Sequence, residues 1–398
     1  MKAKELVEIE NQVLLGTYLR PDFVISHGKG AYLYDSEDTK YLDFVSGIAV
    51  NAFGHSDEQS QKVLAEQASK LWHCSNLYHT KPQVELAKLL VDNTFADKAF
   101  FCNSGTEAVE AAIKFARKWG RANKGDEAIE IISMNKSFHG RTYGALSATG
   151  QPTLQDGFQP MLPGFSFADF NDLESVKEKM TTNVCAVIVE PVQGEGGIIP
   201  ADEAFITGLR KVCDERKVLL ILDEIQCGFG RTGVFCAYEN YGVTPDMMTS
   251  AKPIAAGLPL GAVLMTDDVA KNIKPGDHGT TFGGGPIVSA VATDVLERIL
   301  EPNLLRHVRE MGAYFAQQLK VLQSNFKQIN EVRGKGLMLA ISLNVEPKKV
   351  IDACAKQGLL ICKTGGDAVR FLPPLNVTKK QIDEGIVKLK TALSELGD

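Results

Sequence analysis

The chain of 398 residues is predicted to be an α/β protein, with a large domain around a mainly parallel sheet and a smaller α+β domain. Two observations predict this fold class. From about residue 85, short segments rich in Val, Ile and Leu alternate with helical segments, which is typical of strands joined by crossover helices. After about residue 286 the pattern changes to long helical segments followed by short strands and a closing helix. We therefore expect a large domain over residues 49–285 and a small domain formed by residues 1–48 and 286–398.

Each element is predicted from its local pattern. The segment 29–44 (KGAYLYDSEDTKYLDF) is a candidate hairpin, because two β-rich runs flank a polar turn. Strands are expected at 99–102, 129–134, 185–191, 218–224 and 261–266, and helices at 84–93 and 106–120. In the second half of the chain, helices are expected at 287–300 and 304–324, and strands at 336–343 and 368–375.

The bulk composition excludes several classes of protein. A net charge of −6 gives no reason to expect nucleic acid or an anionic membrane as partner. No apolar run approaches the ~20 residues that span a bilayer. Eight cysteines without a C-x-x-C pair, several of them inside apolar runs, indicate reduced thiols and no zinc site. We expect a cytoplasmic protein without a bound metal.

Polar residues directly after the predicted strands are the candidate site, because ligands of parallel sheets bind beyond the carboxyl ends of the strands. The strand 99–102 is followed by NSGTE, where Ser104 and Glu107 have the spacing of a capping box. The start of the following helix, with Gly105 and Thr106, could bind a phosphate through free N–H groups and the helix dipole. It could equally be a helix cap alone.

The segment SFHGRT, residues 137–142, follows the strand 129–134. Phe138 could stack on a flat ring, and Arg141 could bind a carboxylate with its planar fork. The alternative is an exposed loop with a solvated Arg141 and a structural His139.

Two glutamates, Glu190 and Glu195, surround a glycine-rich turn in VIVEPVQGEGGI. Paired acids can indicate glycosidase chemistry. The glycines are more simply explained by a tight turn.

The segment VLLILDEIQCGFGRTG places Asp223 and Glu224 directly behind an apolar strand, where a carboxylate is costly unless a cation meets it. GFGRTG has the formal spacing of a dinucleotide-binding loop, and an NAD-linked oxidoreductase is the alternative that follows. However, the fingerprint needs its first glycine at the strand–helix turn, and here DEIQC intervenes with no periodic helix afterwards.

Lys252 lies in a Gly/Pro-rich region, SAKPIAAGLPLGA, where a lysine is often merely exposed. In a dry pocket its pKa would be lowered, and it could bond covalently to a carbonyl cofactor.

Taken in order, these segments resemble the class III (ornithine-type) pyridoxal-phosphate-dependent aminotransferases. The resemblance runs over nearly the whole chain, through YLDFVSGIAVNAFGH, NSGTEAVEAAIKFAR, FHGRT, EPVQGEGG, LDEIQCGFGRTG, SAK, HGTTFGGGP and VRFLPPL. It implies the fold type I of PLP-dependent transferases, pyridoxal 5′-phosphate as cofactor, and a homodimer with shared active sites.

The resemblance also implies roles for single residues. Lys252 would bind the cofactor covalently and then act as the base, while Asp223 would keep the pyridine nitrogen protonated. The other cofactor contacts would come from Phe138 on the ring face, Gln226 near the ring hydroxyl, Ser104, Gly105 and Thr106 at the phosphate, and Thr281 from a partner subunit. Pro253, which departs from the family pattern, could shift the backbone of Lys252.

For the substrates, the resemblance implies that Arg141 binds the α-carboxylate of the amino donor and Arg370 that of glutamate. Glu195 would pair with Arg370 when the donor is bound. GIAVNAFGH, SNLYHT, QGEGG and DEIQCGFGRTG are most similar to family members that act on N²-acetyl-L-ornithine with 2-oxoglutarate. Donors left open are N-succinyldiaminopimelate, succinylornithine, ornithine and 4-aminobutyrate. A cofactor-binding protein without catalysis is a further alternative.

Overall fold

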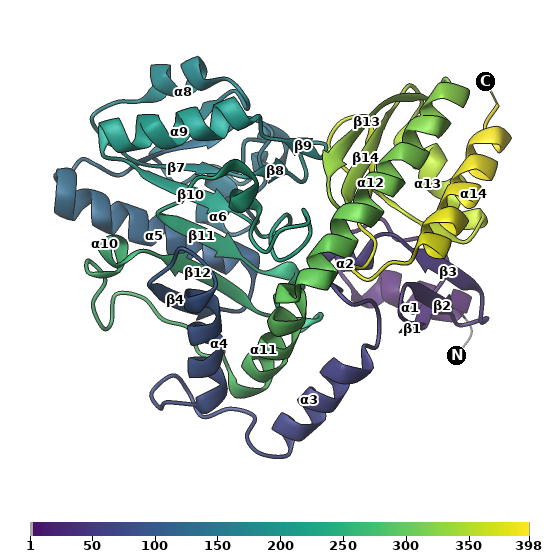
Figure 1. Cartoon of the computed structure of the whole chain (residues 1–398), viewed down its shortest axis with the longest axis horizontal. Coiled ribbons are helices and arrows are strands. Elements are labelled where there is room, and N and C mark those ends of the chain that lie inside the picture. Colours follow the sequence, from purple (N-terminus) through teal and green to yellow (C-terminus); the bar gives the residue numbers. More distant parts are fainter. Residues whose placement is uncertain (1–2, 398) are drawn as a thin grey trace.

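The computed structural model describes residues 3–397, and its central feature is a seven-stranded sheet (Figure 1). In spatial order the strands are β4 (Lys98–Cys102), β12 (Gly261–Met265), β11 (Met247–Ser250), β10 (Leu219–Asp223), β7 (Val184–Val189), β5 (Glu130–Met134) and β6 (Phe165–Ala168). β12 runs antiparallel to β4 and β11, and the other pairs are parallel. The predicted mainly parallel sheet is therefore confirmed, and every strand except β12 ends at the same edge.

The strands form because their side chains are buried on both faces of the sheet. All residues of β7, β10, β11 and β12 are buried. In β10, Leu219 and Ile221 pack with the buried face of α5, whereas Leu220 and Leu222 pack in the cluster that contains α9. This alternation is the two-residue period of a strand covered on both sides.

Helices cover the two faces of this sheet (Figure 1). They are α4 (Lys81–Asp92), α5 (Gly105–Lys124), α6 (Tyr143–Ser147), α8 (Leu173–Lys179), α9 (Glu203–Arg216) and α10 (Asp267–Ala270), and the four-residue α7 (Pro152–Gln155) follows α6. Short elements follow the strands at the carboxyl edge, namely β8 (Val192–Gln193), β9 (Ile199–Pro200) and the 3₁₀ helices η1 (Ala237–Tyr241) and η2 (Lys252–Ala255).

A second, antiparallel sheet lies at the other end of the molecule. Its strands are β13 (Ile329–Lys335), β14 (Met338–Leu343), β17 (Ala368–Phe371) and β16 (Cys362–Lys363), and its helices are α12 (Pro302–Asn325), α13 (Pro347–Lys356) and α14 (Lys379–Glu395). The amino-terminal strands β1 (Ile25–Lys29), β2 (Tyr32–Asp35) and β3 (Lys40–Asp43) join β15 (Leu359–Leu360), which pairs with β3. The hairpin predicted over residues 29–44 is β2–β3.

The division into two domains stays a prediction, and the helix that follows the predicted boundary shows with which sheet the chain packs there. The remaining helices are α1 (Ala3–Val13), α2 (Ser46–Ala49), α3 (Glu58–Ala68) and α11 (Pro286–Leu300). α11 packs against α3, α4 and η2. This helix follows the predicted boundary at residue 285 but lies with the large sheet, and α12 then continues towards the second sheet (Figure 1).

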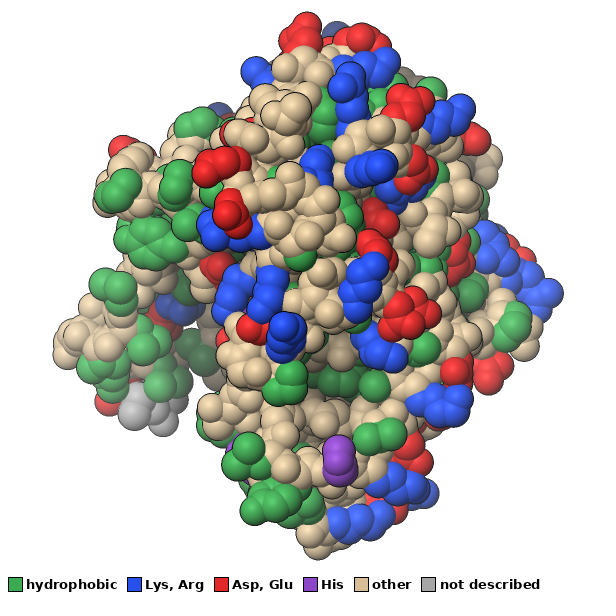
Figure 2. Space-filling model, turned by 90° about the vertical axis from the view of Figure 1, so that its left-hand side faces the viewer, with side chains coloured by type: hydrophobic (Ala, Val, Ile, Leu, Met, Phe, Trp, Pro, Cys, Tyr) green, Lys and Arg blue, Asp and Glu red, His purple; other side chains and the backbone are tan. Residues whose placement is uncertain are grey.

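The surface carries charges of both signs. On the face drawn in Figure 2, Lys and Arg side chains lie interspersed with Asp and Glu. Within residues 3–397, no helix combines the length and the apolar character needed to cross a membrane.

Candidate active site

A cavity of about 390 Å³ lies at the carboxyl edge of the large sheet. Its lining comes from the loops after β4, β5, β7, β10 and β11, which meet there because these strands are parallel. The predicted site residues that line it are Ser104, Gly105, Thr106, Phe138, Arg141, Asp223, Gln226 and Lys252. Glu195 and Arg370 lie behind Gln226, whereas Thr281 lines a separate recess.

The amino end of α5 forms one end of the cavity. Ser104 is the N-cap and accepts a hydrogen bond from the backbone N of Glu107 at 3.3 Å. The carboxylate of Glu107 accepts a hydrogen bond from the backbone N of Asn103 at 2.6 Å. In the usual capping box this bond comes from the N-cap residue, here Ser104, so the predicted capping box forms with its second bond shifted by one residue. The first N–H groups of a 20-residue helix and its dipole therefore point towards this end of the cavity.

The loop with Phe138 and Arg141 lies directly against this helix start. Gly140 has a φ of 137°, and a Cβ there would lie 2.2 Å from Oγ1 of Thr106, so only glycine permits the approach. Oγ1 of Thr106 accepts from the backbone N of Arg141 at 3.2 Å. The Arg141 side chain is exposed, with its guanidinium carbon 5.8 Å from the Phe138 ring centroid.

Asp223 is 3% exposed and its carboxylate is held from two sides. Oδ1 accepts from the backbone N of Ile225 at 3.1 Å, and Oδ2 lies 2.7 Å from Nδ1 of His139. Burial acts to lower the pKa of His139, but the bond and the charge of Asp223 outweigh it, so the pKa of His139 is raised. The strand-end acid is therefore paired with an imidazole whose protonated form it favours.

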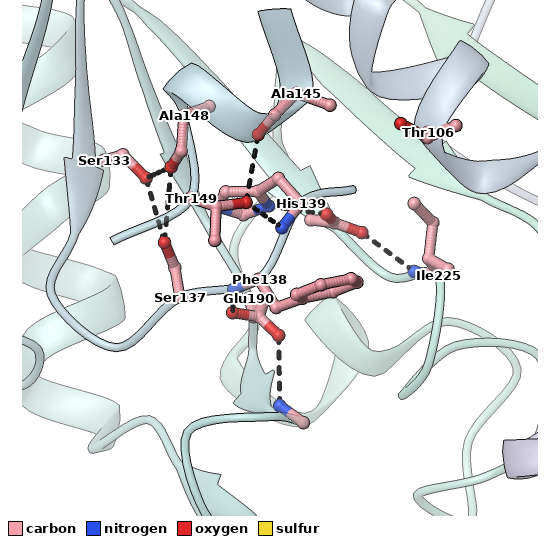
Figure 3. A network of polar contacts seen from close by, with 12 residues as sticks. Thr106, Ser133, Ser137, Phe138, His139, Ala145, Ala148, Thr149, Glu190 and Ile225 are labelled. Atoms are coloured by element: carbon pink, nitrogen blue, oxygen red, sulfur yellow. Dashed lines mark hydrogen bonds and ion pairs between the residues drawn. The ribbon is translucent and has the colours of Figure 1, made fainter. Parts of the chain in front are cut away.

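His139 holds its loop in place as well as contacting Asp223. Its backbone N donates to Oγ1 of Thr149 at 2.9 Å, which fixes the loop (Figure 3). Its Nε2 is buried and has no hydrogen-bond partner within residues 3–397. The pairing with Asp223 could not be read from the sequence, because the two residues are far apart along the chain.

The neighbouring acid, Glu224, points to the other side of the strand, as alternation requires. Its carboxylate accepts from the backbone N of Ala237 at 2.5 Å and of Tyr238 at 2.7 Å, at the start of η1. Burial raises the pKa of Glu224 to about 8. Glu224 therefore binds the start of a 3₁₀ helix, and of these two acids only Asp223 lines the cavity.

Glu190 also lines the cavity, although the sequence indicated no role for it in the site. Its carboxylate accepts from the backbone N of Phe138 at 3.1 Å and of Gly194 at 3.0 Å. Figure 3 shows the Phe138 ring beside this carboxylate. Burial raises the pKa of Glu190 to about 7. Glu190 directly follows the strand β7, as the other site residues follow their strands. This position at a strand end is the sequence signal that could have identified it.

Lys252 opens η2 directly after β11. It has a φ of 38°, in the left-handed region that side chains rarely adopt and that is found mostly at functional sites. Burial, and next the charge of Arg370, lower the pKa of the amine, so the neutral nucleophilic form is favoured. The charges of Glu195, Asp223 and Glu190 act in the opposite direction, and of these acids Asp223 and Glu190 line the cavity together with Lys252.

Arg370 is buried behind the cavity wall, 2% exposed. Its Nη1 lies 2.5 Å from Oε1 of Glu195 and 3.2 Å from Oε1 of Gln226. Glu190 and Glu195 therefore bind different groups and do not form a glycosidase-like pair.

The segment GFGRTG does not form a dinucleotide site. Arg231 is fully buried and its Nη1 donates to the carbonyl oxygens of Leu337 at 3.2 Å and Pro373 at 2.5 Å. The element that follows is the five-residue η1, which cannot supply the helix start of a phosphate site. The segment instead connects the large sheet to the second sheet.

The expected cofactor, pyridoxal 5′-phosphate, fits this cavity. The helix start at Gly105 and Thr106 suits its phosphate, and a flat ring can lie against Phe138. The buried carboxylate of Asp223 suits a cationic ring nitrogen, and Lys252 supplies an amine for its aldehyde. These groups differ in chemistry and lie around one cavity, which is the arrangement that such a molecule requires.

The known proteins that this chain resembles are aminotransferases. The family model described as aminotransferase class-III matches residues 17–393. The mitochondrial acetylornithine aminotransferase of Alnus glutinosa is 46% identical over 399 residues, which cover 99% of this chain and 88% of that protein. The succinylornithine transaminase of Salmonella typhimurium is 44% identical over 387 residues, which cover 96% and 95%. The crystal structure of ornithine aminotransferase from Toxoplasma gondii has a TM-score of 0.96 and 31% identity over 100% of this chain and 96% of that one, and a second structure of it is described with PLP at the active site.

Proposed function

The chain belongs to the class III aminotransferases, which depend on pyridoxal 5′-phosphate, and we propose that it transfers the distal amino group of N²-acetyl-L-ornithine to 2-oxoglutarate. The products would be N-acetyl-L-glutamate 5-semialdehyde and L-glutamate, a step of arginine biosynthesis. The observation that carries this proposal is the contrast between two arginines. Arg141 is exposed at the cavity, whereas Arg370 is buried and paired with Glu195. A donor with one free carboxylate needs only the first arginine.

The residues around the cavity would hold the cofactor by its different parts. Gly105 and Thr106, with Ser104, would bind the phosphate at the start of α5. Phe138 would stack on the ring, and Gln226 would contact its hydroxyl group. Asp223, fixed by His139, would hold the proton on the ring nitrogen.

When bound, the cofactor withdraws electron density from the substrate carbon next to the reacting amine, so that this carbon can lose a proton. Lys252 is placed to move that proton. Burial lowers the pKa of its Nζ and so favours the neutral amine, which would accept the proton from the substrate carbon and donate it to the cofactor carbon. The same low pKa makes Lys252 the group that bonds to the cofactor between substrates.

The two arginines would recognise the two substrates in turn. Arg141 would bind the α-carboxylate of N²-acetyl-L-ornithine, so that the distal amine reaches Lys252. Arg370 would bind the α-carboxylate of glutamate once Glu195 moves aside. Pairing with Glu195 avoids an uncompensated buried cation when the donor is present.

Replacement of Glu195 tests this exchange. Glu195→Gln removes the negative charge while keeping the size, so Arg370 is available to a carboxylate at all times. We expect the KM for glutamate to fall and the KM for N²-acetyl-L-ornithine to rise, each by about tenfold. Steady-state kinetics in both directions measure this; unchanged constants for both substrates would exclude the exchange. Glu331→Gln, which removes a largely exposed acid paired with Arg333, is the control.

A panel of amines assayed with 2-oxoglutarate tests the donor. We expect the highest kcat/KM for N²-acetyl-L-ornithine, compared with N-succinyl-L-ornithine, N-succinyl-LL-diaminopimelate, L-ornithine and 4-aminobutyrate. A higher value for another amine would reassign the donor within the family, and no turnover with any would contradict the proposed function. The relatives named for acetylornithine and for succinylornithine are similarly close, so the assay decides between them.

We also propose that the active protein is a homodimer. Thr281, expected to reach the phosphate of a partner subunit, is exposed and lies next to the segment 73–80. The side chain of Asn76 in this segment donates hydrogen bonds to the carbonyl oxygens of Thr280 and Gly283, on either side of Thr281. Large apolar side chains of this region are exposed, among them Leu77 at 85% and Trp72 at 71%. A second copy would cover them. Sedimentation equilibrium should give twice the mass of one chain.

A cytoplasmic location is part of the same proposal. All eight cysteines are free thiols, as in proteins of reducing compartments.

A further inference from the structure

The guanidinium of Arg370 is held by three side chains, and two of them carry no charge. Cys362 on β16 lies directly opposite Arg370 on β17 in an antiparallel pair. Its Sγ lies 3.2 Å from Nε of Arg370, on the edge of the guanidinium away from Glu195. Gln226 and Glu195 bind the Nη1 nitrogen.

The Cys362 thiol remains protonated in this position. Burial raises its pKa above the usual value, and the charge of Arg370 offsets this only in part. Its sulfur therefore accepts a hydrogen bond without cancelling the positive charge. A carboxylate in its place would neutralise Arg370 permanently.

The partners of Arg370 thus divide into fixed and exchangeable ones. The side chain of Glu195, the one carboxylate that binds Arg370 within residues 3–397, is 28% exposed and lies on a turn. Cys362 belongs to the strand next to Arg370, so its Cβ stays opposite Arg370 and only a rotation about its Cα–Cβ bond would move the sulfur. If Glu195 left, the bond from Nε to Sγ and the bond from Nη1 to Gln226 would still orient the guanidinium plane.

We propose that Cys362 is a positioning residue that orients Arg370 through Nε while leaving its charge for the α-carboxylate of glutamate or 2-oxoglutarate. This inference rests on the proposed function, because it concerns the half-reaction of glutamate and 2-oxoglutarate, in which the site must bind a second carboxylate. It makes Cys362 a determinant of the amino acceptor and not of the amino donor.

Three substitutions of Cys362 distinguish the effect of its hydrogen-bond acceptor from the effects of side-chain shape and charge. Cys362→Val nearly conserves the volume and the β propensity but removes the acceptor. Cys362→Ser retains an acceptor, and Cys362→Asp adds a negative charge. Single-turnover reactions of the holoenzyme, followed by its visible absorbance, give the apparent Kd for glutamate and for N²-acetyl-L-ornithine. Binding of glutarate, a dicarboxylate that cannot react, is measured by calorimetry.

For Cys362→Val we expect the Kd for glutamate and glutarate to rise by about fivefold to tenfold, the loss of one hydrogen bond, with the donor half-reaction within about twofold of the parent. Cys362→Ser should recover most of the loss. Cys362→Asp should weaken glutamate and glutarate more than Cys362→Val does, because the new carboxylate competes for Arg370. Cys213→Ala, which truncates a buried cysteine of α9, should change neither half-reaction.

Equal changes in both half-reactions, or a serine variant that behaves like the valine variant, would overturn the proposal. If the valine variant melts at a lower temperature than the parent, Cys362→Ala provides a second protein without the acceptor. If the proposed amino donor is wrong, the parent enzyme will not react with N²-acetyl-L-ornithine, which is a separate result. The effect of each Cys362 variant on glutamate would then be compared with its effect on the amine that does react.

Discussion

Replacing Lys252 by alanine is expected to reduce the rate of amino transfer by at least about 10⁴-fold. The substitution removes both the amine that bonds to the cofactor and the base that moves the substrate proton, and a positioned base alone contributes about 10²–10⁴-fold. No other lysine lines the cavity to replace it, within the part of the chain that the structure describes. The measurement is kcat with N²-acetyl-L-ornithine and 2-oxoglutarate.

A chemical readout complements the rate. Borohydride treatment of the parent protein should bleach its yellow colour and fix the cofactor mass on the peptide that contains Lys252. The alanine variant should show no such modified peptide. Lys356→Ala, an exposed lysine at the end of α13, is the control and should retain both rate and modification. If the alanine variant kept more than a hundredth of the parent rate, Lys252 would not be the catalytic amine.

Asp223→Asn is expected to lower kcat by about 10²–10³-fold, comparable to the removal of one preorganised electrostatic contact in other enzymes. The amide keeps the shape, and its oxygen can still accept from the backbone N of Ile225. It lacks the negative charge that would hold a proton on the ring nitrogen and that raises the pKa of His139. Steady-state kinetics and cofactor affinity, measured by equilibrium dialysis, check this prediction.

The adjacent acid supplies a matched control for Asp223. Glu224→Gln changes the same functional group one residue away, but on the side of the strand that binds η1. It leaves one backbone N–H facing an amide NH₂ group that cannot accept its hydrogen bond, so we expect a loss of about 1–3 kcal/mol in the free energy of unfolding and a kcat within about twofold of the parent. Equal losses of kcat in both variants would show that any substitution at the end of β10 lowers kcat, and that the charge of Asp223 has no specific role.

Local patterns were sufficient to predict most of the large sheet. The strand over residues 218–224 and the helix over 106–120 could be predicted because burial on two faces and helical periodicity leave direct traces in neighbouring residues. The candidate cavity followed from one topological rule, that parallel strands end at a common edge. Residues such as Thr106, Phe138 and Asp223 could therefore be expected to lie together without coordinates.

The contacts that hold the site together could not be predicted in this way. By local pattern alone Asp223 and Glu224 are equivalent acids that must face opposite ways, and only the family resemblance assigned a role to Asp223. Which one faces the cavity depends on what covers each face of β10. The bond between His139 and Asp223 depends on the order β10–β7–β5, which brings their loops to neighbouring positions.

The sequence by itself determined the class of fold, the chemistry expected at the strand ends and the family resemblance, because each depends on residue type and short spacing. The resemblance implied Glu195 as a partner of Arg370, but only the tertiary structure decided the other partners of the buried charges: His139 for Asp223, the start of η1 for Glu224, and Cys362 for Arg370. The physical reason is that a buried charge takes whichever polar group the packing brings within about 3 Å, and that group usually belongs to a distant part of the chain.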